Sequence, residues 1–416
     1  MKFRILTCAT LIALLALLAL PTRCLAKEQK LPHYTVIDLG TLGGTFSVAF
    51  GINNRGAVVG DSTLSGDTIL RGFFWQKGSM TDLGTLGGLN SSAESAFSDL
   101  NQIGGASETS ALDPNAEDFC AFGTDLTCHP FLWQKGVQTA LPTLGGTNGL
   151  VTQVNNLGVA VGNAETATVD NDCLAPQVLD WKPVFWYQGK VHELPTLDGD
   201  TVGTALVVND LGLMAGATRQ SCAVHAPHPV LWQYGKIVKL GSLGGARGSV
   251  GEINNWGQIV GWSDLAGDTT SHAYLWQQFT GMIDLGTLPG DVSSSGYGIN
   301  DLGRIVGSSC DSDGNCRAVL WQGSAMTDLN TLIPPDSTLY LLEATGGINN
   351  LGQIAGYAYD TVSGEIHPFL LNPCDRNCAR QSRDLRNSLP RTRPQLPDNL
   401  RQLLQQRKQR RASRKL

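Results

Sequence analysis

The chain has 416 residues, 49 of them glycine, and a formal net charge of −6 at pH 7. So much glycine excludes a mainly helical protein, while the regular recurrence of Val, Ile, Leu and Trp still allows a core. Residues 27–378 carry 15 Lys/Arg and 34 Asp/Glu, a net charge of −19, whereas residues 379–416 carry 12 Lys/Arg and 2 Asp, a net charge of +10. The sequence therefore predicts an acidic body, long enough for one large or two ordinary domains, and a basic tail.

Residues 1–26 have the layout of a secretory signal peptide. A basic start at residues 1–4 precedes an apolar stretch at residues 9–20, and small residues end at a predicted cleavage site after Ala26. A lipoprotein anchor at Cys24 is the alternative, but Arg23 stands where a small residue is expected. No other stretch reaches 18 apolar residues, so we expect no transmembrane span. The mature protein is expected to be secreted, extracellular or periplasmic, and monomeric.

Export to an oxidising compartment makes disulfides the expected state of the eight cysteines that remain after cleavage. Three pairs are close in sequence, and the remaining two cysteines are left for each other. The predicted disulfides are Cys120–Cys128, Cys310–Cys316, Cys374–Cys378 and Cys173–Cys222. Zinc is the alternative for Cys374 and Cys378, but no second Cys or His pair stands nearby.

Three short motifs recur seven times along the body. The first is a D-L-G-T-L-G-G heptad, at 38–44, 82–88, 140–146, 193–199, 239–245, 284–290 and, decayed, 328–334. An apolar-Asn-x-x-Gly turn follows each heptad, at 52–56, 100–104, 154–158, 208–212, 253–257, 299–303 and 348–352. A third motif, usually ending in Trp, follows each turn, at 72–75, 130–133, 183–186, 229–232, 273–276, 318–321 and 368–371. A phosphate-binding role for the heptad is excluded because neither a Lys-Ser/Thr pair nor a helix follows.

Each repeat resolves into four short strands, rich in Val, Ile and aromatic residues and separated by Asn/Gly turns. The sequence therefore predicts an all-β fold, a seven-bladed β-propeller of four-stranded blades, with a β-solenoid as the alternative. A lone fourth strand at 34–40 precedes the first full repeat, and the last repeat ends on a third strand at 367–372. We therefore expect the N-terminal strand to join the last blade and close the ring.

The heptad, the I-N-x-x-G-x-V-G hairpin and the H-A/P-F-L-W strand together resemble the HAF-repeat family of bacterial extracellular repeat proteins. The resemblance covers about residues 34–371 and implies an extracellular repeat protein without a well-defined biochemical activity. Blade two departs from the pattern, since LNQIGGAS lacks the usual valines.

Two connections between second and third strands, at 105–128 and 163–181, are longer than the others, and long loops on a rigid scaffold are frequent functional sites. Both loops are acidic, and we expect their face to bind a cation, a basic partner or a polar glycan. The candidate residues are Glu108, Asp113, Glu117, Asp118, Asp125, Glu165, Asp170, Asp172, Asp180, Trp181 and the nearby His225.

Other chemistry-bearing residues are expected to be structural. Six tryptophans at equivalent places in third strands should pack between blades, leaving Trp181, Trp256 and Trp262 as exposed contact candidates. His129, His228, His272 and His367 occupy equivalent strand starts and should form hydrogen bonds there. Asp311, Asp313 and Asn315 resemble part of a calcium loop but lack its later Glu, so a plain turn is favoured and no cofactor is expected.

No catalytic residues are identifiable, and the sequence favours a secreted binding scaffold whose ligand is a protein or a glycan. The alternative is an extracellular polysaccharide hydrolase or lyase, which would need two carboxylates, or a carboxylate and a His, at the channel mouth. The segment 372–416 is predicted to be mostly disordered, with a short helix at 399–411 capped by Asp398. Its basic charge suits an anionic envelope surface, and nucleic acid is not expected as a partner in an exported protein.

Overall fold

The structure is a computed structural model, and it describes residues 32–95, 97–173, 175–223, 226–323, 325–374 and 393–415. The chain divides into two compact units, Met1–Pro32 and His33–Leu416, and all the elements below belong to the second. The predicted signal peptide lies outside the described residues. Among the helices of the described part, none is long and apolar enough to cross a membrane.

Five antiparallel sheets have four strands each, paired in chain order. The first two are β6 (Ser91–Ala93), β7 (Ile103–Leu112), β8 (Leu126–Gln134), β9 (Val137–Ala140), and β10 (Gly145–Val154), β11 (Ala160–Val169), β12 (Leu179–Tyr187), β13 (Lys190–Glu193). The next is β14 (Val202–Val208), β15 (Met214–Arg219), β16 (His228–Gln233), β17 (Lys236–Lys239). The last two are β18 (Gly244–Ile253), β19 (Ile259–Leu265), β20 (Ser271–Gln277), β21 (Gly281–Asp284), and β22 (Ser293–Ile299), β23 (Ile305–Cys310), β24 (Cys316–Gln322), β25 (Ala325–Asp328).

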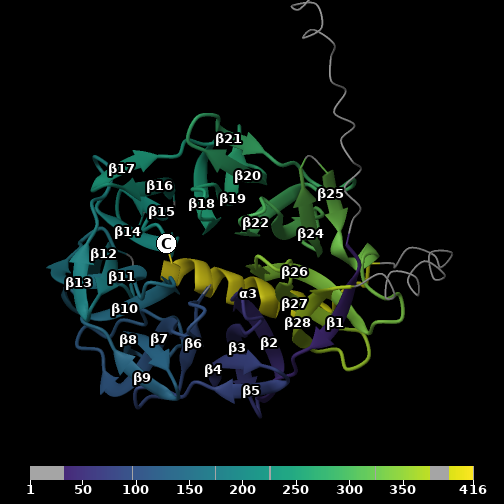
Figure 1. The fold of residues 1–416 in the computed structure, drawn as a ribbon. Helices are drawn as coiled ribbons and strands as arrows, with labels where there is room; N and C mark the ends of the chain where they lie inside the picture. Colours follow the sequence, from purple (N-terminus) through teal and green to yellow (C-terminus); the bar gives the residue numbers. More distant parts are fainter. Residues whose placement is uncertain are drawn as a thin grey trace, which may run out of the picture. The chain divides into compact units, whose positions relative to one another are not determined.

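An eight-stranded sheet combines strands from both ends of the body. One half is β2 (Gly43–Ile52), β3 (Val58–Leu64), β4 (Leu70–Gln76) and β5 (Ser79–Asp82). The other half is β26 (Leu339–Ile348), β27 (Ile354–Asp360), β28 (Ile366–Pro373) and β1 (Tyr34–Asp38), and a 3-10 turn, η1 (Leu329–Thr331), precedes it. In the strand pairing of the described residues, the two halves meet at one parallel bridge between Phe46 and Ile366. The described strands thus form seven sets of four, which follow one another in chain order in Figure 1.

The N-terminal strand completes the last set, as its sequence position predicted. β1 pairs antiparallel with β28, from Tyr34 opposite Pro373 to Asp38 opposite Phe369. The prediction of an all-β fold built from four-stranded units is therefore confirmed, and so is the pairing of the first strand with the last.

The Asn turns link each set to the next. In the first turn, Oδ1 of Asn53 accepts the N–H groups of Arg55 and Ala57 at 3.0 and 3.1 Å, and Gly56 has a φ of +72°. The following residue is Asn or Asp, and its backbone N–H donates to the side-chain Oδ1 of its counterpart in the next turn. These bonds, of 2.6 to 3.0 Å, run from Asn54 to Asp99, Asp99 to Asn156, Asn156 to Asp210, Asp210 to Asn255, Asn255 to Asp301, Asp301 to Asn350 and Asn350 to Asn54. We call this closed cycle the Asn/Asp ring.

The Asn/Asp ring corrects the alignment of the second repeat. The turn equivalent to 52–56 is 97–101 and not 100–104, because Ser98 replaces the first Asn and Asn101, at φ +57°, replaces the turn glycine. Asn tolerates this left-handed conformation better than other residues with a side chain. The apparent loss of valines therefore reflects a shift of three residues.

The last glycine of the I-N-x-x-G-x-V-G motif is required by close packing. The first strand of most sets has a register shift opposite this glycine, for example between Gly296 and Gly298. A Cβ atom added at Gly307 would lie 1.8 Å from the carbonyl oxygen of Ser295, well inside contact distance. The six equivalents, each 1.8 to 2.1 Å from a carbonyl oxygen, are Gly60, Gly105, Gly162, Gly216, Gly261 and Gly356.

The hydrophobic core lies between successive sets. One cluster, for example, joins Val161 of β11 to Val208, Val230 and Trp232 of the following set. The six third-strand tryptophans are 1 to 7% exposed, which confirms their predicted packing role: Trp75, Trp133, Trp186, Trp232, Trp276 and Trp321.

The end of the basic tail is a helix, α3 (Asp398–Lys415). It begins at Asp398, where the sequence placed the cap, but it is longer than predicted. The expectation of disorder is wrong for residues 393–415, because Leu396 and Leu404 are buried against the sheets. Residues 375–392 lie outside the described part of the chain.

Candidate binding site at the loop face

A cavity of about 590 Å³ lies between α3 and the inner strands of the sheets, and we call it the central cavity. Six of the seven strand sets contribute to its lining, together with α3. Its aromatic walls are Phe46, Phe50, Trp262, Tyr297 and Tyr357; its acidic groups are Asp61, Asp67, Glu252 and Glu343; and its basic groups are Arg407, Lys408 and Arg410 of α3. The cavity opens on the side of the long loops, since Ala121 and Phe122 also line it.

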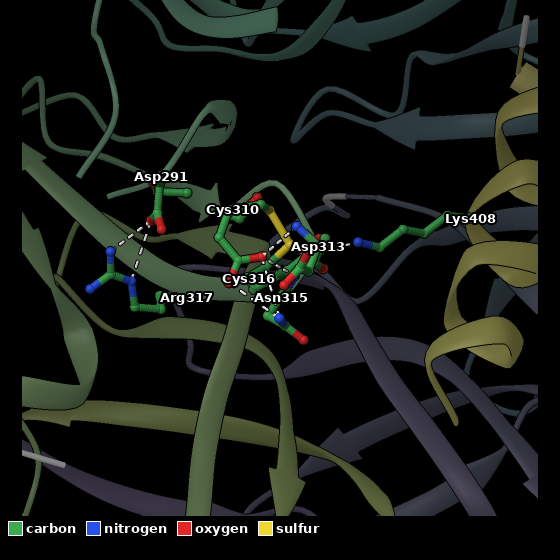
Figure 2. Close-up of a disulfide and its surroundings, with 12 residues drawn as sticks. Asp291, Cys310, Asp313, Asn315, Cys316, Arg317 and Lys408 are labelled. Carbon is green, nitrogen blue, oxygen red and sulfur yellow. Dashed lines mark hydrogen bonds and ion pairs between the residues drawn. A yellow bond between two sulfur atoms is a disulfide. The ribbon is translucent and has the colours of Figure 1, made fainter. Parts of the chain in front are cut away.

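Glu343 is a buried carboxylate of the cavity with partners in both a sheet and α3. It is 2% exposed, accepts a hydrogen bond from the Tyr297 hydroxyl at 2.9 Å, and forms an ion pair with Lys408 of α3. Burial raises the pKa of Tyr297, and the neighbouring Glu343 carboxylate raises it further. Tyr297 is therefore a neutral hydrogen-bond donor that orients Glu343. Figure 2 shows Lys408 projecting from α3 toward the Cys310–Cys316 hairpin region.

Glu252 and Asp61 line other parts of the cavity. The Glu252 carboxylate accepts from Nε2 of Gln153 at 3.0 and 3.1 Å. Asp61, which is buried, accepts the N–H of Ala93 at 2.9 Å and lies 2.7 Å from the Ser92 hydroxyl. The same hydroxyl is 3.2 Å from Oε1 of Glu94, also buried, so two carboxyl groups share one hydroxyl donor.

The segment before α3 adds a second ionic anchor. The guanidinium of Arg393 forms ion pairs with Asp311 and, at 2.7 Å, with Asp291. The side chain of Asp291 is 1% exposed and also pairs with Arg317 at 2.8 Å, as the dashed lines in Figure 2 show. Burial alone would lower the pKa of Arg393, but these hydrogen bonds and carboxylate charges raise it. A carboxylate with two guanidinium partners is a strong, geometrically defined contact.

Most of the predicted acidic residues do not face solvent. Glu108, Asp113, Glu117, Glu165 and Asp180 are all less than 9% exposed. Their hydrogen bonds hold the two long loops in place. Both loops are shorter than expected: β7 extends to Leu112 and β8 begins at Leu126, while β11 extends to Val169 and β12 begins at Leu179. Glu117, for example, accepts the N–H of Leu179 in the neighbouring set at 2.7 Å.

Glu165 has the most perturbed of these carboxyl groups. It accepts the N–H of Asn148 at 2.9 Å and the Nε2 of Gln177 at 3.0 Å. Gln177 also donates to Glu117 at 3.0 Å, so one amide bridges two buried acids. Burial and the neighbouring Glu117 raise the pKa of Glu165 to about 8. These acids form a structural network between two loops.

The other candidates are divided between exposed and internal positions. Asp125 and Asp172 are exposed, Asp170 caps the turn to Asp172, and Asp118 accepts the N–H of Gly123 at 3.0 Å. Burial raises the pKa of Asp118. His225 lies outside the described residues.

The three tryptophans predicted to be exposed differ in position. The expectation is wrong for Trp181, which is 5% exposed and lies beneath the Arg219 guanidinium at 5.0 Å. Trp256 is 75% exposed in an Asn turn, as expected, and Trp262 lines the central cavity.

Three predicted disulfides are present: Cys120–Cys128, Cys173–Cys222 and Cys310–Cys316. Cys374 is disulfide-bonded, and its predicted partner Cys378 lies outside the described residues. Within the Cys310–Cys316 hairpin, Asp311 accepts the N–H groups of Asp313 and Asn315 at 3.0 and 2.9 Å. This is the hydrogen-bonding pattern of a turn, and the other oxygen of Asp311 pairs with Arg393.

Three of the four equivalent histidines pair with aspartates through Nδ1. The pairs are His228 with Asp200 at 3.0 Å, His272 with Asp284 at 2.9 Å, and His367 with Asp38 at 2.8 Å. The last pair joins β1 to β28, and the hydrogen bond that His367 donates to Asp38 raises the pKa of His367 to about 9. The Nδ1 atom of His129 is buried and has no hydrogen-bond partner among the described residues, and burial lowers the pKa of His129.

Sequence reasoning missed Glu252, Tyr297 and Glu343. Each stands in a first strand, two to six residues before the first Asn of the turn, where other repeats have mainly small or apolar residues. A polar residue in an otherwise apolar strand was the sequence signal that could have identified them as cavity residues.

No protein-family model and no curated protein sequence matches the chain. Solved structures that resemble it include three distant ones. The β-propeller domain of the Trilobed protease from Pyrococcus furiosus has a TM-score of 0.39 and 10% identity, covering 68% of this chain and 81% of its own. TolB from Acinetobacter baumannii has a TM-score of 0.38 and 12% identity, with coverages of 80% and 65%. The SapL1 lectin in complex with α-methyl fucoside has a TM-score of 0.37 and 10% identity, with coverages of 69% and 96%.

Proposed function

We propose that the chain is a secreted seven-bladed β-propeller that acts as a binding module, with its ligand site in the central cavity. The seven sets of four strands and the closed Asn/Asp ring support the blade number. Disulfides in the described residues and the signal-like N-terminal sequence support secretion. The resemblance to HAF repeats agrees with both parts of this proposal.

The observation that carries the binding role is the lining of the cavity. Concave sites that bind small ligands or peptide segments combine apolar and aromatic walls with a few fixed polar groups. Here Phe50 and Trp262 provide aromatic surface, while Glu252 and Glu343 are held by neighbouring side chains. Such groups accept hydrogen bonds from sugar hydroxyls or from cationic nitrogens, so the ligand is a glycan or a basic segment of a protein.

The test is a binding screen with the full mature chain on a glycan array and on short Lys- and Arg-containing peptides. Trp262→Phe and Glu252→Gln should lower the affinity for a ligand found there at least about tenfold, or about 1.4 kcal/mol. Trp256→Phe is the matched control, because Trp256 lies in an Asn turn and does not line the cavity. If the control lowers affinity as much as Trp262→Phe, the site lies elsewhere.

A hydrolase or lyase acting on polysaccharide is the second candidate. Its support is the pair of buried carboxyl groups, Asp61 and Glu94, that share the Ser92 hydroxyl beside the cavity. Release of reducing ends from a bound polysaccharide, abolished by Asp61→Asn, would favour this candidate over the binding module.

A further inference from the structure

We infer that the central cavity recognises a basic amphipathic helix. In this chain α3, from its own tail, occupies that site as an intramolecular ligand, which we call the cis helix. This inference rests on the proposed site in the central cavity and names its ligand class. The contacts of α3 have the three parts expected of a helix bound in a groove, namely apolar anchors, ion pairs and an electrostatic match of the surfaces.

The apolar anchors come from leucines on one side of the segment. Leu396 and Leu404 are 6 and 9% exposed and pack in one cluster with Phe46, Tyr340 and Tyr357 of the sheets. Leu400 and Leu403 lie partly buried against the same cluster. Within α3, positions 400, 403, 404 and 407 follow helical spacing and form one stripe, and Leu396 joins the same cluster from just before the helix.

The ion pairs flank the apolar stripe. Lys408 pairs with Glu343 at its C-terminal side, and Arg393 pairs with Asp291 and Asp311 before the helix begins. Between them, the Arg407 guanidinium lies 4.1 Å from the centre of the Phe46 ring, a cation–π contact. The carboxylates Glu343 and Asp291 are almost completely buried, and removing a cationic partner would leave such a charge unpaired.

The helix depends on this surface. Most of the stability of a helix in a protein comes from packing of one of its faces, and α3 is rich in Arg, Lys and Gln with Asp398 as its only acid. The strongly acidic body and the basic tail also attract each other at long range. The helix is tethered to β28 by the 24 residues 374–397, which gives it an effective concentration on the order of millimolar at its site.

Because α3 is tethered at the site, it competes with any free ligand. A free ligand must be a basic amphipathic helix that binds more tightly than α3, or the cis contacts must first be weakened. The experiment uses the full mature chain and a fluorescein-labelled peptide of residues 393–415, followed by fluorescence anisotropy. Lys408→Gln weakens the cis helix and leaves the groove intact, so its affinity for the peptide should be 5- to 10-fold higher than that of the wild type.

Gln409→Glu is the matched control, since it changes the helix charge by the same −1 at an exposed neighbouring position. It should leave peptide affinity within twofold of the wild type. Glu343→Gln should show no gain, because it removes the partner of Lys408 for both the cis helix and the peptide. A gain equal to that of Lys408→Gln in either variant would overturn the inference.

Amide hydrogen exchange of α3 reports release directly. If amide exchange of α3 is faster in Lys408→Gln and the peptide still fails to bind at 100 times the concentration of the protein, α3 is not a ligand of the site. A dimer in light scattering, with α3 exchanged between copies, would replace the cis helix by a second copy and also overturn the inference. If the protein in these cases still binds a ligand in a way that depends on Trp262, the proposed function stands. If that ligand binding is lost, the proposed function is wrong as well.

Discussion

The backbone N–H of Asn350 donates to Oδ1 of Asn54 at 3.0 Å, across 296 residues of sequence. This bond closes the Asn/Asp ring, so each turn is fixed by the next and the last turn is fixed by the first. The ring lies at the opposite ends of the strands from the long loops. It therefore stabilises the scaffold without contributing to the central cavity.

We predict that Asn54→Ala lowers the free energy of unfolding by about 1–2 kcal/mol. The change removes the acceptor of the Asn350 N–H and the donor to Asp99. Urea unfolding at neutral pH measures the loss. Arg55→Ala, one residue along at an exposed position, is the control and should change stability by less than about 0.5 kcal/mol.

Gly307→Ala is expected to destabilise the fold by at least about 2 kcal/mol or to prevent folding, because its Cβ would overlap the carbonyl oxygen of Ser295. Gly189→Asn is the comparison. Gly189 also stands in a repeat but in open space with a φ of +75°, which Asn tolerates. Thermal unfolding distinguishes the two, and equal losses would mean that crowding at Gly307 is not the cause.

The His367–Asp38 pair predicts a pH dependence of stability. The pKa of His367 is raised to about 9, so the contribution of the pair is fully present below about pH 6.5 and is lost as the pH rises through 9. Because Asp38 is partly exposed, we expect a loss of only about 1 kcal/mol. Denaturant unfolding from pH 6 to 10 should show this decline in the wild type and not in His367→Gln. A parallel decline in both proteins would exclude the pair as its source.

Glu165 predicts a second pH dependence of stability, which arises from a buried carboxyl group. Its pKa is raised to about 8, so the folded state holds a proton that the unfolded state releases near pH 4.5, and stability falls between these values. Glu165→Gln avoids the charge but keeps only one acceptor oxygen for the N–H donors of Asn148 and Gln177. Between pH 4.5 and 8.5 the variant should lose at least about 1 kcal/mol less stability than the wild type. The exposed Glu193→Gln serves as control and should show no such gain.

The repeated motifs were enough to predict the strands, the turns and the pairing of β1 with β28, since local patterns recur at every set. The second repeat was misaligned because Ser98 and Asn101 replace the residues by which the turn was identified. Sequence spacing predicted three disulfides correctly. It could not show that Glu108, Glu117 and Glu165 are buried, because their partners lie far away in the sequence. Asn90, Leu179 and Asn148, for example, are 17 to 62 residues from the acids that they bind.

The sequence also did not predict that α3 packs against the sheets. The sequence showed an acidic body and a basic tail, but nothing local connects Lys408 to Glu343 or Arg393 to Asp291. These contacts depend on how distant strands come together. The same is true of the central cavity, to which six sets each contribute a few side chains.

The pairing of β1 with β28 has a consequence for biosynthesis. β1 is among the first strands to be made and its partner is the last, so the final sheet stays incomplete until more than 330 residues have followed β1. Contacts of such long sequence separation form slowly, and an unpaired strand edge invites pairing with other chains meanwhile. Nascent chains of this protein should therefore depend on chaperones that hold β1 until translation ends, and truncation before β28 should lead to aggregation.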